Sequence, residues 1–310
     1  MIIILAGMLG LLPTVFSETT AAQQGQGHFV VTVLPQKGAD SSTNMIQQDF
    51  QLKVNGKASS ITGWLPLREQ NGNLEMVILI DSSATASLGL QFGEIASFIR
   101  SMPPDAKIAV GFMSAGRAVM AGPLSTNHEE VANQLRIPSA PAGSNASPYF
   151  CLSDLAKHWG SADHSARREV VLITDGVDNY GERLDLNDPY VQAAINDSIR
   201  AGIVVYSIFW PNRGDRDRSR LAGFDGKNLL TLVTQATGGF SYWTGGSFQP
   251  VSFNPYFDDI LWRLKNQYRL SFSSMLKGKP QVQNIDFKVK NLPNDVCAPQ
   301  RVFVTNSSGG

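Results

Sequence analysis

The sequence predicts an α/β fold with a doubly wound, mostly parallel sheet, flanked by a small β unit that both termini build. Continuous apolar runs alternate with segments of helical spacing between residues 74 and 267. Unbroken apolar runs of this kind are typical of strands that are buried on both faces. Residues 27–73 and 268–310 contain β-rich segments instead. The chain therefore divides into a central α/β domain, residues 74–267, and two β segments that we expect to pair with each other.

The charge composition argues against two classes of partner. The chain has 310 residues, is 43% hydrophobic and carries 26 basic and 26 acidic residues, so its formal net charge is zero. Such a balance argues against a nucleic-acid partner and against a membrane surface held by charge. Two interpretations are kept for a cluster of four arginines: it forms a local basic patch, or it belongs to a solvated loop. The residues are Arg213, Arg216, Arg218 and Arg220.

The N-terminus indicates export. The apolar stretch Ile2–Phe16 has the length of a signal-peptide core and is short for a membrane span, although no Lys or Arg precedes it. We expect residues 1–17 to be a signal peptide or an N-terminal anchor. The protein would then be periplasmic or secreted, with membrane attachment only through an uncleaved N-terminal segment. Cys151 and Cys297 form either one bridge or two free thiols, and the sequence favours free thiols.

The elements follow from local patterns. Three strands, His28–Pro35, Asp49–Val54 and Ile61–Leu67, are expected in the first β segment, and Asn55-Gly56 is a strong hairpin signal. In the central domain, Ser147 is expected to cap a helix that starts at Pro148. The central strands are expected at Met76–Ile80, Ile108–Met113, Val119–Met120, Glu169–Thr174, Ile203–Phe209 and Phe240–Trp243. The helices are expected at Leu88–Met102, Thr126–Leu135, Pro148–Trp159, Pro189–Ala201, Asn228–Thr237 and Pro255–Gln267, and the last strands at Tyr268–Ser273, Val282–Val289 and Arg301–Thr305.

Two aspartates stand where ligands bind in this type of sheet. Asp81 directly follows the apolar run that ends at Ile80, and Asp175 directly follows Thr174. Ligands of open α/β sheets bind beyond the carboxyl ends of the strands, so we expect both carboxylates at one edge. Ser83 and Thr85 add hydroxyls at alternate positions after Asp81. Hard oxygen ligands with few carboxylates suit Mg²⁺, or Mn²⁺ in its place.

These residues also resemble a known family. The segment Asp81–Thr85 (DSSAT) is similar to the Asp-x-Ser-x-Ser/Thr motif of von Willebrand factor A (VWFA) domains, and Thr174-Asp175-Gly176 is similar to the Thr-Asp-Gly motif of the same family. Together they resemble a metal-ion-dependent adhesion site (MIDAS). The resemblance covers about residues 74–267 and implies a Rossmann-like fold. The whole chain also resembles bacterial proteins in which such a domain is flanked by β segments.

The resemblance also implies the ligands of the metal ion. In the family, two hydroxyls bind the ion directly, the aspartates often act through water, and a Thr from a further loop completes the set. This chain has no Thr in that loop; Ser147 is the best substitute and Ser144 the second. The expected metal ligands are Asp81, Ser83, Thr85, Ser147 and Asp175, with weak affinity because the Thr is missing. An Asp or Glu of a protein partner would fill the open position on the ion.

Other interpretations of the same residues remain. Asp81 can be a helix cap, and Ser83 and Thr85 can be ordinary turn hydroxyls. Asp81 can also be the nucleophile of a Mg²⁺-dependent phosphohydrolase of the haloacid dehalogenase type. That family needs a second Asp two residues later as general acid, and here that position is Ser83. No catalytic residue or organic cofactor is therefore expected, and the predicted function is non-enzymatic adhesion or protein binding.

Overall fold

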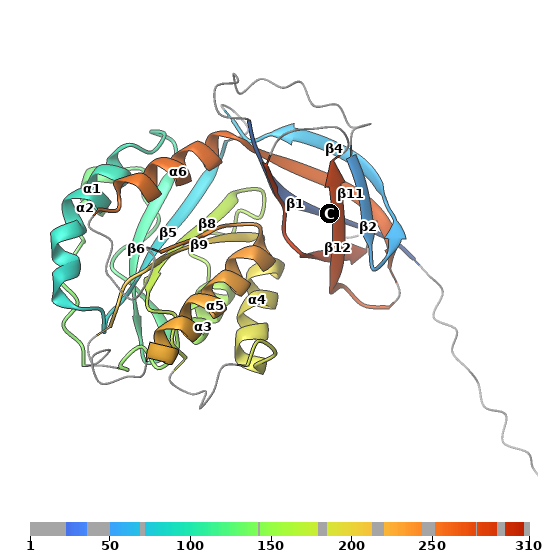
Figure 1. Cartoon of the computed structure of the whole chain (residues 1–310). Helices are drawn as coiled ribbons and strands as arrows, with labels where there is room; N and C mark the ends of the chain where they lie inside the picture. Colours follow the sequence, from blue (N-terminus) through green and yellow to red (C-terminus); the bar gives the residue numbers. More distant parts are fainter. Residues whose placement is uncertain are drawn as a thin grey trace, which may run out of the picture.

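The computed structural model describes residues 23–35, 50–68, 72–141, 143–178, 185–212, 220–243, 252–276, 278–289 and 295–306. The predicted signal peptide or anchor, residues 1–17, and the side chains of the predicted basic patch lie outside these ranges. Two sheets form the molecule, a central sheet covered by helices and a curled sheet beside it (Figure 1). Within the described ranges, no helix is both long enough and apolar enough to cross a bilayer.

The central sheet has six strands in the order β10-β9-β8-β5-β6-β7. All neighbouring pairs are parallel except β6 and β7, which form an antiparallel pair at one edge. Every residue of β5, β8 and β9 is buried, as the unbroken apolar runs predict. The strands are β5 (Leu74–Asp81), β6 (Lys107–Ser114), β7 (Arg117–Met120), β8 (Arg167–Thr174), β9 (Ile203–Phe209) and β10 (Ser241–Tyr242).

Helices cover both faces of this sheet, which confirms the doubly wound prediction (Figure 1). On one face pack α1 (Phe92–Arg100), α2 (His128–Ala132) and α6 (Asn254–Lys265), and on the other α3 (Pro148–Lys157), α4 (Pro189–Arg200) and α5 (Arg220–Thr237). The first predicted helix is divided, because a 3₁₀ helix, Ala86–Gln91, precedes α1.

Helix α5 begins at Arg220, whereas the sequence predicts a start at Asn228. Gly223 and Gly226 have low helix propensity, so the sequence of the first turns is typical of a loop. Gly226 is needed where the helix passes the end of β8, because a Cβ there would lie 2.2 Å from the carbonyl oxygen of Asp175. Gly226 therefore stands in the helix despite its low helix propensity, because the backbones of α5 and of residue 175 are in close contact there.

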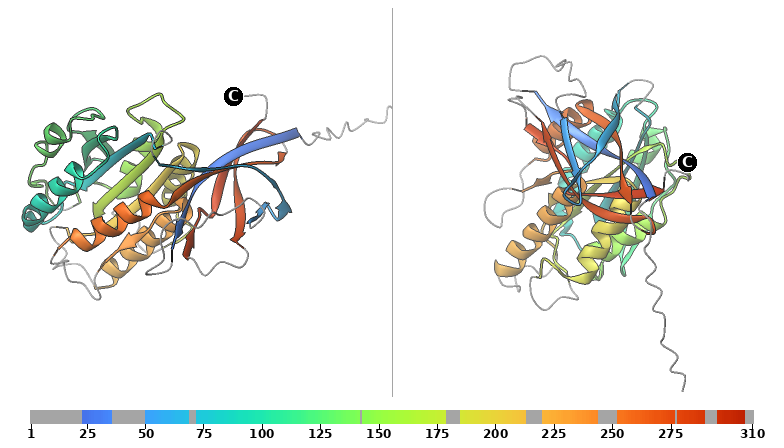
Figure 2. Two further views of the ribbon diagram at one scale, coloured as in Figure 1. Left: turned by 90° about the horizontal axis from the view of Figure 1, so that it is seen from above. Right: turned by 90° about the vertical axis from the view of Figure 1, so that its right-hand side faces the viewer.

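The second sheet is larger than the predicted small β unit. Its eight antiparallel strands follow the order β3-β2-β12-β14-β1-β11-β4, with β13 also paired to β1. As predicted, strands from both ends of the chain pair, from Gln23↔Leu276 to Thr32↔Gln267 between β1 and β11. Figure 2 shows these strands crossing around a common interior. The strands are β1 (Gln23–Leu34), β2 (Phe50–Val54), β3 (Lys57–Ala58), β4 (Ser60–Pro66), β11 (Gln267–Leu276), β12 (Gln281–Val289), β13 (Asp295–Cys297) and β14 (Arg301–Asn306).

Local predictions in this sheet are accurate at the hairpin. Asn55 and Gly56 have φ values of 47° and 74°, so the β2–β3 turn uses the left-handed conformations that the Asn-Gly pair predicts. Strand β13 is too short to be recognised from the sequence. Cys151 is buried, Cys297 is half-buried, and both thiols are free, as the sequence favours.

Two buried titratable side chains, Arg167 and Glu169, lie where the two sheets meet. Arg167 on β8 donates hydrogen bonds of 2.9 Å to the carbonyl of Leu264 in α6 and to Oε1 of Gln267 in β11. Glu169 shares its face of the strand, is fully buried, and has no hydrogen-bond partner for its carboxylate oxygens among the described residues. Burial raises the pKa of Glu169 to about 8, although the nearby Arg167 opposes this shift.

Stability should therefore fall as the pH rises. Glu169 binds its proton more tightly in the folded state than in the unfolded chain, where the pKa is 4.5. Its contribution to the free energy of unfolding is complete below pH 4.5 and is lost between there and about pH 8. We expect Glu169→Gln to abolish this part of the pH dependence and to stabilise the protein above pH 8. Urea unfolding of both proteins at pH 5 and pH 9 tests this; equal pH dependence in the two would contradict it.

Candidate functional site

Asp81 and Asp175 lie at the carboxyl edge of the central sheet. Asp81 is the last residue of β5, and Asp175 follows the last residue of β8. The two strands are direct neighbours, with Ile80 opposite Ile173. Both aspartates are buried, at 0% and 1% exposure. The sheet topology therefore gives them the shared edge that the sequence predicts.

Asp81 is the centre of a dense hydrogen-bond cluster. Its Oδ1 accepts bonds from the backbone N–H of Ser83 at 2.9 Å and from the Ser83 hydroxyl at 2.6 Å. Its Oδ2 accepts from the side-chain amide of Asn145 at 2.7 Å, the Thr174 hydroxyl at 2.8 Å and the side-chain amide of Asn212 at 2.9 Å. These five donors replace the water that a buried carboxylate loses.

The donors come from four separate parts of the chain. Ser83 belongs to the loop after β5, Asn145 to the loop before α3, Thr174 to the end of β8, and Asn212 to the segment after β9. The Asp81 carboxylate thereby connects the loops that surround the carboxyl edge. Asp81 does not cap a helix, because its bond to the Ser83 N–H closes a local turn of the Asx type.

Thr85 turns toward β9 rather than toward Asp81. Its hydroxyl accepts a hydrogen bond of 2.9 Å from the indole Nε1 of the buried Trp210 and lies 3.0 Å from the Ser87 hydroxyl. The Thr85 N–H donates to the carbonyl of Pro211 at 3.1 Å. Thr85 therefore fastens the loop after β5 to the segment that follows β9.

Ser147 caps α3, as predicted, with its hydroxyl accepting from the Tyr149 N–H at 3.3 Å. The side chain that reaches Asp81 from this loop is Asn145. Ser144 contributes its backbone carbonyl, which accepts from the Ala115 N–H at 2.7 Å. The structure thus shows neither serine with a hydrogen bond to Asp81.

Asp175 occupies a crowded turn. Its Oδ1 accepts from the Val177 N–H at 3.0 Å. Gly176 has φ +71°, and a Cβ there would lie 2.5 Å from the carbonyl oxygen of Gly226. The Tyr149 hydroxyl donates to the Gly176 carbonyl at 2.7 Å. Burial, and then the negative charge of Asp175, hold the pKa of Tyr149 well above its usual range, so this phenol remains a donor.

Sequence reasoning missed three donors to Asp81: Thr174, Asn145 and Asn212. Asn212 carried a usable signal, because it follows a buried strand as Asp81 and Asp175 do. Thr174 stands opposite the position of Asp81 once the β5–β8 register is known. Asn145 carried no comparable signal, since it lies in an irregular loop far from any strand end.

The donor set decides how well a Mg²⁺ ion fits beside Asp81. A carboxylate offers about four lone-pair sites, and Asp81 already accepts five hydrogen bonds. Two of the donors are amide groups, which present hydrogen atoms where a cation or its bound water would need an acceptor. In this arrangement both oxygens of Asp81 are occupied by hydrogen bonds from within the chain, which leaves no free lone pair for a cation.

Comparison with known proteins adds little. No protein family model and no curated protein matches the sequence. Among solved structures, an aerotolerance-related membrane protein from Bacteroides fragilis NCTC 9343 is 16% identical, with 62% of this chain and 98% of that chain covered and a TM-score of 0.42. The conserved hypothetical protein BatB from Bacteroides thetaiotaomicron is also 16% identical (60% and 95% covered, TM-score 0.39).

A third solved structure is proximal thread matrix protein 1 from the mussel byssus, described with a zinc-occupied MIDAS motif. It is 14% identical, with 65% of this chain and 48% of that chain covered and a TM-score of 0.42. Similarities this low carry no argument about site or function, which therefore rest on the geometry of this chain.

Replacing Asp81 should destabilise the protein strongly. In Asp81→Asn, an NH₂ group would face amide and hydroxyl donors, and several buried donors would lose their acceptor. We expect a loss of about 3 kcal/mol in the free energy of unfolding, measured by urea denaturation. Asp258→Asn, at an exposed position of α6, is the matched control and should change stability by less than about 0.5 kcal/mol. Equal effects of the two substitutions would contradict the cluster.

The hydrogen bonds of Asp81 also predict the response to divalent ions. With its lone pairs occupied, saturating Mg²⁺ or Mn²⁺ should leave the Tm within about 1 °C of its value in a chelator, since a ligand stabilises only a state that it binds. Differential scanning calorimetry of the full chain measures this. A rise of several degrees that is absent in Asp81→Ala would instead support the metal site predicted from the sequence.

Proposed function

We propose that this chain is a non-enzymatic protein-binding domain of the VWFA type, and that its partner binds at the carboxyl edge of the central sheet. The observation that carries the proposal is the cluster around Asp81. It holds the loops of that edge in fixed positions, and two of those loops present exposed apolar side chains. A preorganised rim with apolar side chains suits a protein partner.

The apolar side chains are those of Leu90 and Ile137, which are 82% and 57% exposed. Ile137 lies against the turn that carries Leu90, because a Cβ built on Gly89 would be 3.2 Å from it. The Ala140 N–H donates to the carbonyl of Ser82 at 3.1 Å, which fixes the Ile137 loop beside Asp81. Burying one such side chain in an interface contributes about 1.5–3 kcal/mol.

The magnesium ion and the partner's Asp or Glu are the part of the prediction that comes from the family resemblance. The hydrogen bonds of Asp81 give this part no support, so the proposed contact uses the apolar rim and its polar neighbours. Export is also included in the proposal, on the strength of the apolar stretch in residues 1–17.

The geometry disfavours the phosphohydrolase alternative. A nucleophilic carboxylate needs a lone pair directed at the phosphorus atom, but both Asp81 oxygens are buried and hydrogen-bonded. At the position of the general acid, Ser83 donates its proton to Asp81. This arrangement makes Asp81 a structural acceptor.

Site-specific photocrosslinking tests the proposed binding face. We expect a photoreactive residue at position 90 of the full chain to capture a defined protein in the cells that produce it. The same residue at position 275, which is 56% exposed on β11 in the other sheet, should not capture that protein. Excess wild-type chain should suppress the crosslink, and excess Leu90→Ser/Ile137→Ser chain should not. Capture that is equal at both positions, or insensitive to the competitor, would refute the proposal.

A further inference from the structure

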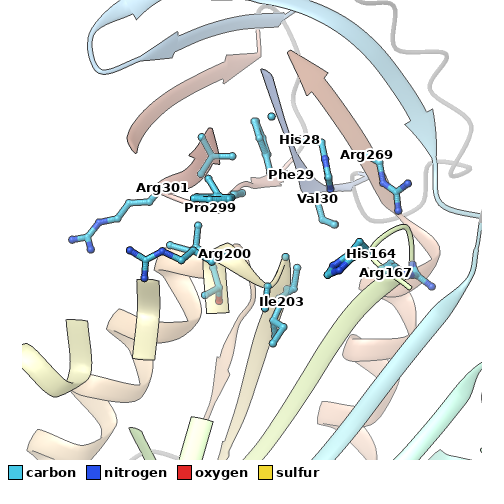
Figure 3. A pocket seen from close by; sticks show the side chains of 18 of the residues that line it. His28, Phe29, Val30, His164, Arg167, Arg200, Ile203, Arg269, Pro299 and Arg301 are labelled. Carbon is cyan, nitrogen blue, oxygen red and sulfur yellow. The ribbon is translucent and has the colours of Figure 1, made fainter. Parts of the chain in front are cut away.

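A cavity of about 170 Å³ lies between the two sheets, at the opposite edge of the central sheet from Asp81. Its lining comes from β1, β11 and β14 of the antiparallel sheet and, in the α/β part, from the start of β8 and β9 and the ends of α4 and α5. Figure 3 shows His28, Phe29 and Val30 on one side, with His164, Arg167 and Ile203 on the other. The cavity is therefore a space that only the assembled chain creates.

The middle of the cavity is apolar and its ends are cationic. Phe29, Val30, Ile203 and Pro299 contribute apolar surface. Arg200 and Arg301 lie toward one end, and Arg167 and Arg269 toward the other (Figure 3). Among the described residues that line the cavity, four are Arg, two are His and none is Asp or Glu. This imbalance is notable in a chain whose formal net charge is zero.

Arg167 is the most deeply placed of these cations, with 5% exposure. Both acceptors of its Nη1 are neutral, and its Nε has no hydrogen-bond partner among the described residues. Glu169 is the adjacent carboxyl, but its two oxygens have no hydrogen-bond partner and form no ion pair with Arg167 among the described residues. Burial also raises the pKa of Glu169, which favours its neutral form.

Arg269 and Arg301 are also bound to neutral acceptors. Arg269 donates to the carbonyl of Ser165 at 2.5 Å, and Arg301 donates to Oε1 of Gln192 at 2.8 Å. Asp163 is close enough to attract Arg269, but the two form no ion pair within the described structure. Arg200 differs, because it pairs with Asp197 at 3.2 Å. Three of the four guanidinium groups thus lack an anionic partner.

We propose that this cavity binds a small organic anion, with an apolar group in the middle of the cavity and a carboxylate or phosphate held by Arg269 or Arg301. Guanidinium groups recognise these two head groups through paired hydrogen bonds. A neutral ligand would leave the arginines unmatched, and a bare inorganic ion would leave the apolar walls uncovered. The ligand would contact both sheets and so stabilise their junction. This site is separate from the proposed protein-binding edge and does not depend on it.

Calorimetric titration of the full chain provides the first test. The probes are benzoate and phenyl phosphate, with benzyl alcohol as the uncharged control and inorganic phosphate as the control without an apolar group. We expect at least one of the two aromatic anions to bind and to raise the Tm, and both controls to bind at least about tenfold more weakly. Which anion binds more tightly identifies the head group.

Substitutions then locate the binding. Arg269→Gln and Arg301→Gln keep the length of the side chain but remove its charge, and we expect at least one of them to weaken binding about tenfold. Arg100→Gln is the matched control, because Arg100 forms an exposed pair with Glu129 on the far side of the α/β part. It should leave the affinity unchanged.

Crystals of the full chain soaked in 4-bromobenzoate give a readout that does not depend on variants. Anomalous bromine density between Phe29 and Ile203 would support the proposal. The proposal is overturned if neither aromatic anion binds, if benzyl alcohol binds as well as benzoate, if all three substitutions have the same effect, or if the bromine lies elsewhere.

Discussion

A carboxylate that is cut off from water must be matched by donors, and in this protein that constraint falls on Asp81. Five hydrogen bonds converge on its two oxygens, and they come from the loop after β5, the loop before α3, the end of β8 and the segment after β9. The shape of the whole carboxyl edge depends on these bonds, because together they anchor four separate segments of the chain. The glycines at 176 and 226 serve the same edge by letting α5 approach the end of β8.

The two edges of the central sheet bury charges of opposite sign: a carboxylate at the carboxyl edge and guanidinium groups at the amino edge. At the carboxyl edge, a buried negative charge is surrounded by neutral donors, so little of its charge is available to a ligand. At the amino edge, three of the four cavity arginines contact neutral acceptors, and the cavity has no acidic lining residue among those described. The balanced net charge of the chain conceals this separation. A protein surface at one edge and an anion site at the other are consistent with the same fold.

The Asp81–Thr85 motif shows why a motif alone leaves its chemistry open. Carboxylate and hydroxyl oxygens at a strand end can accept a cation, and they can equally accept hydrogen bonds from amide groups. In this chain the amide groups of Asn145 and Asn212 donate to Asp81. These residues lie 64 and 131 positions from Asp81 in the chain. The Ser147 hydroxyl instead accepts a hydrogen bond at the N-terminus of α3, and the Thr85 hydroxyl accepts one from the Trp210 indole. The identity of the partners, and not of the motif, determines what Asp81 does.

The sequence by itself determined the strands and helices of the α/β part, the pairing of the two termini, the Asn55-Gly56 turn, the Ser147 cap and the position of both aspartates at a strand end. These features follow from periodicity, turn residues and the geometry of parallel sheets, which are local or generic. Only the tertiary structure decided the donors of Asp81, the early start of α5, the size of the second sheet and the cationic cavity. Each of these depends on contacts between residues distant in the chain, and such contacts leave no periodic pattern in the sequence.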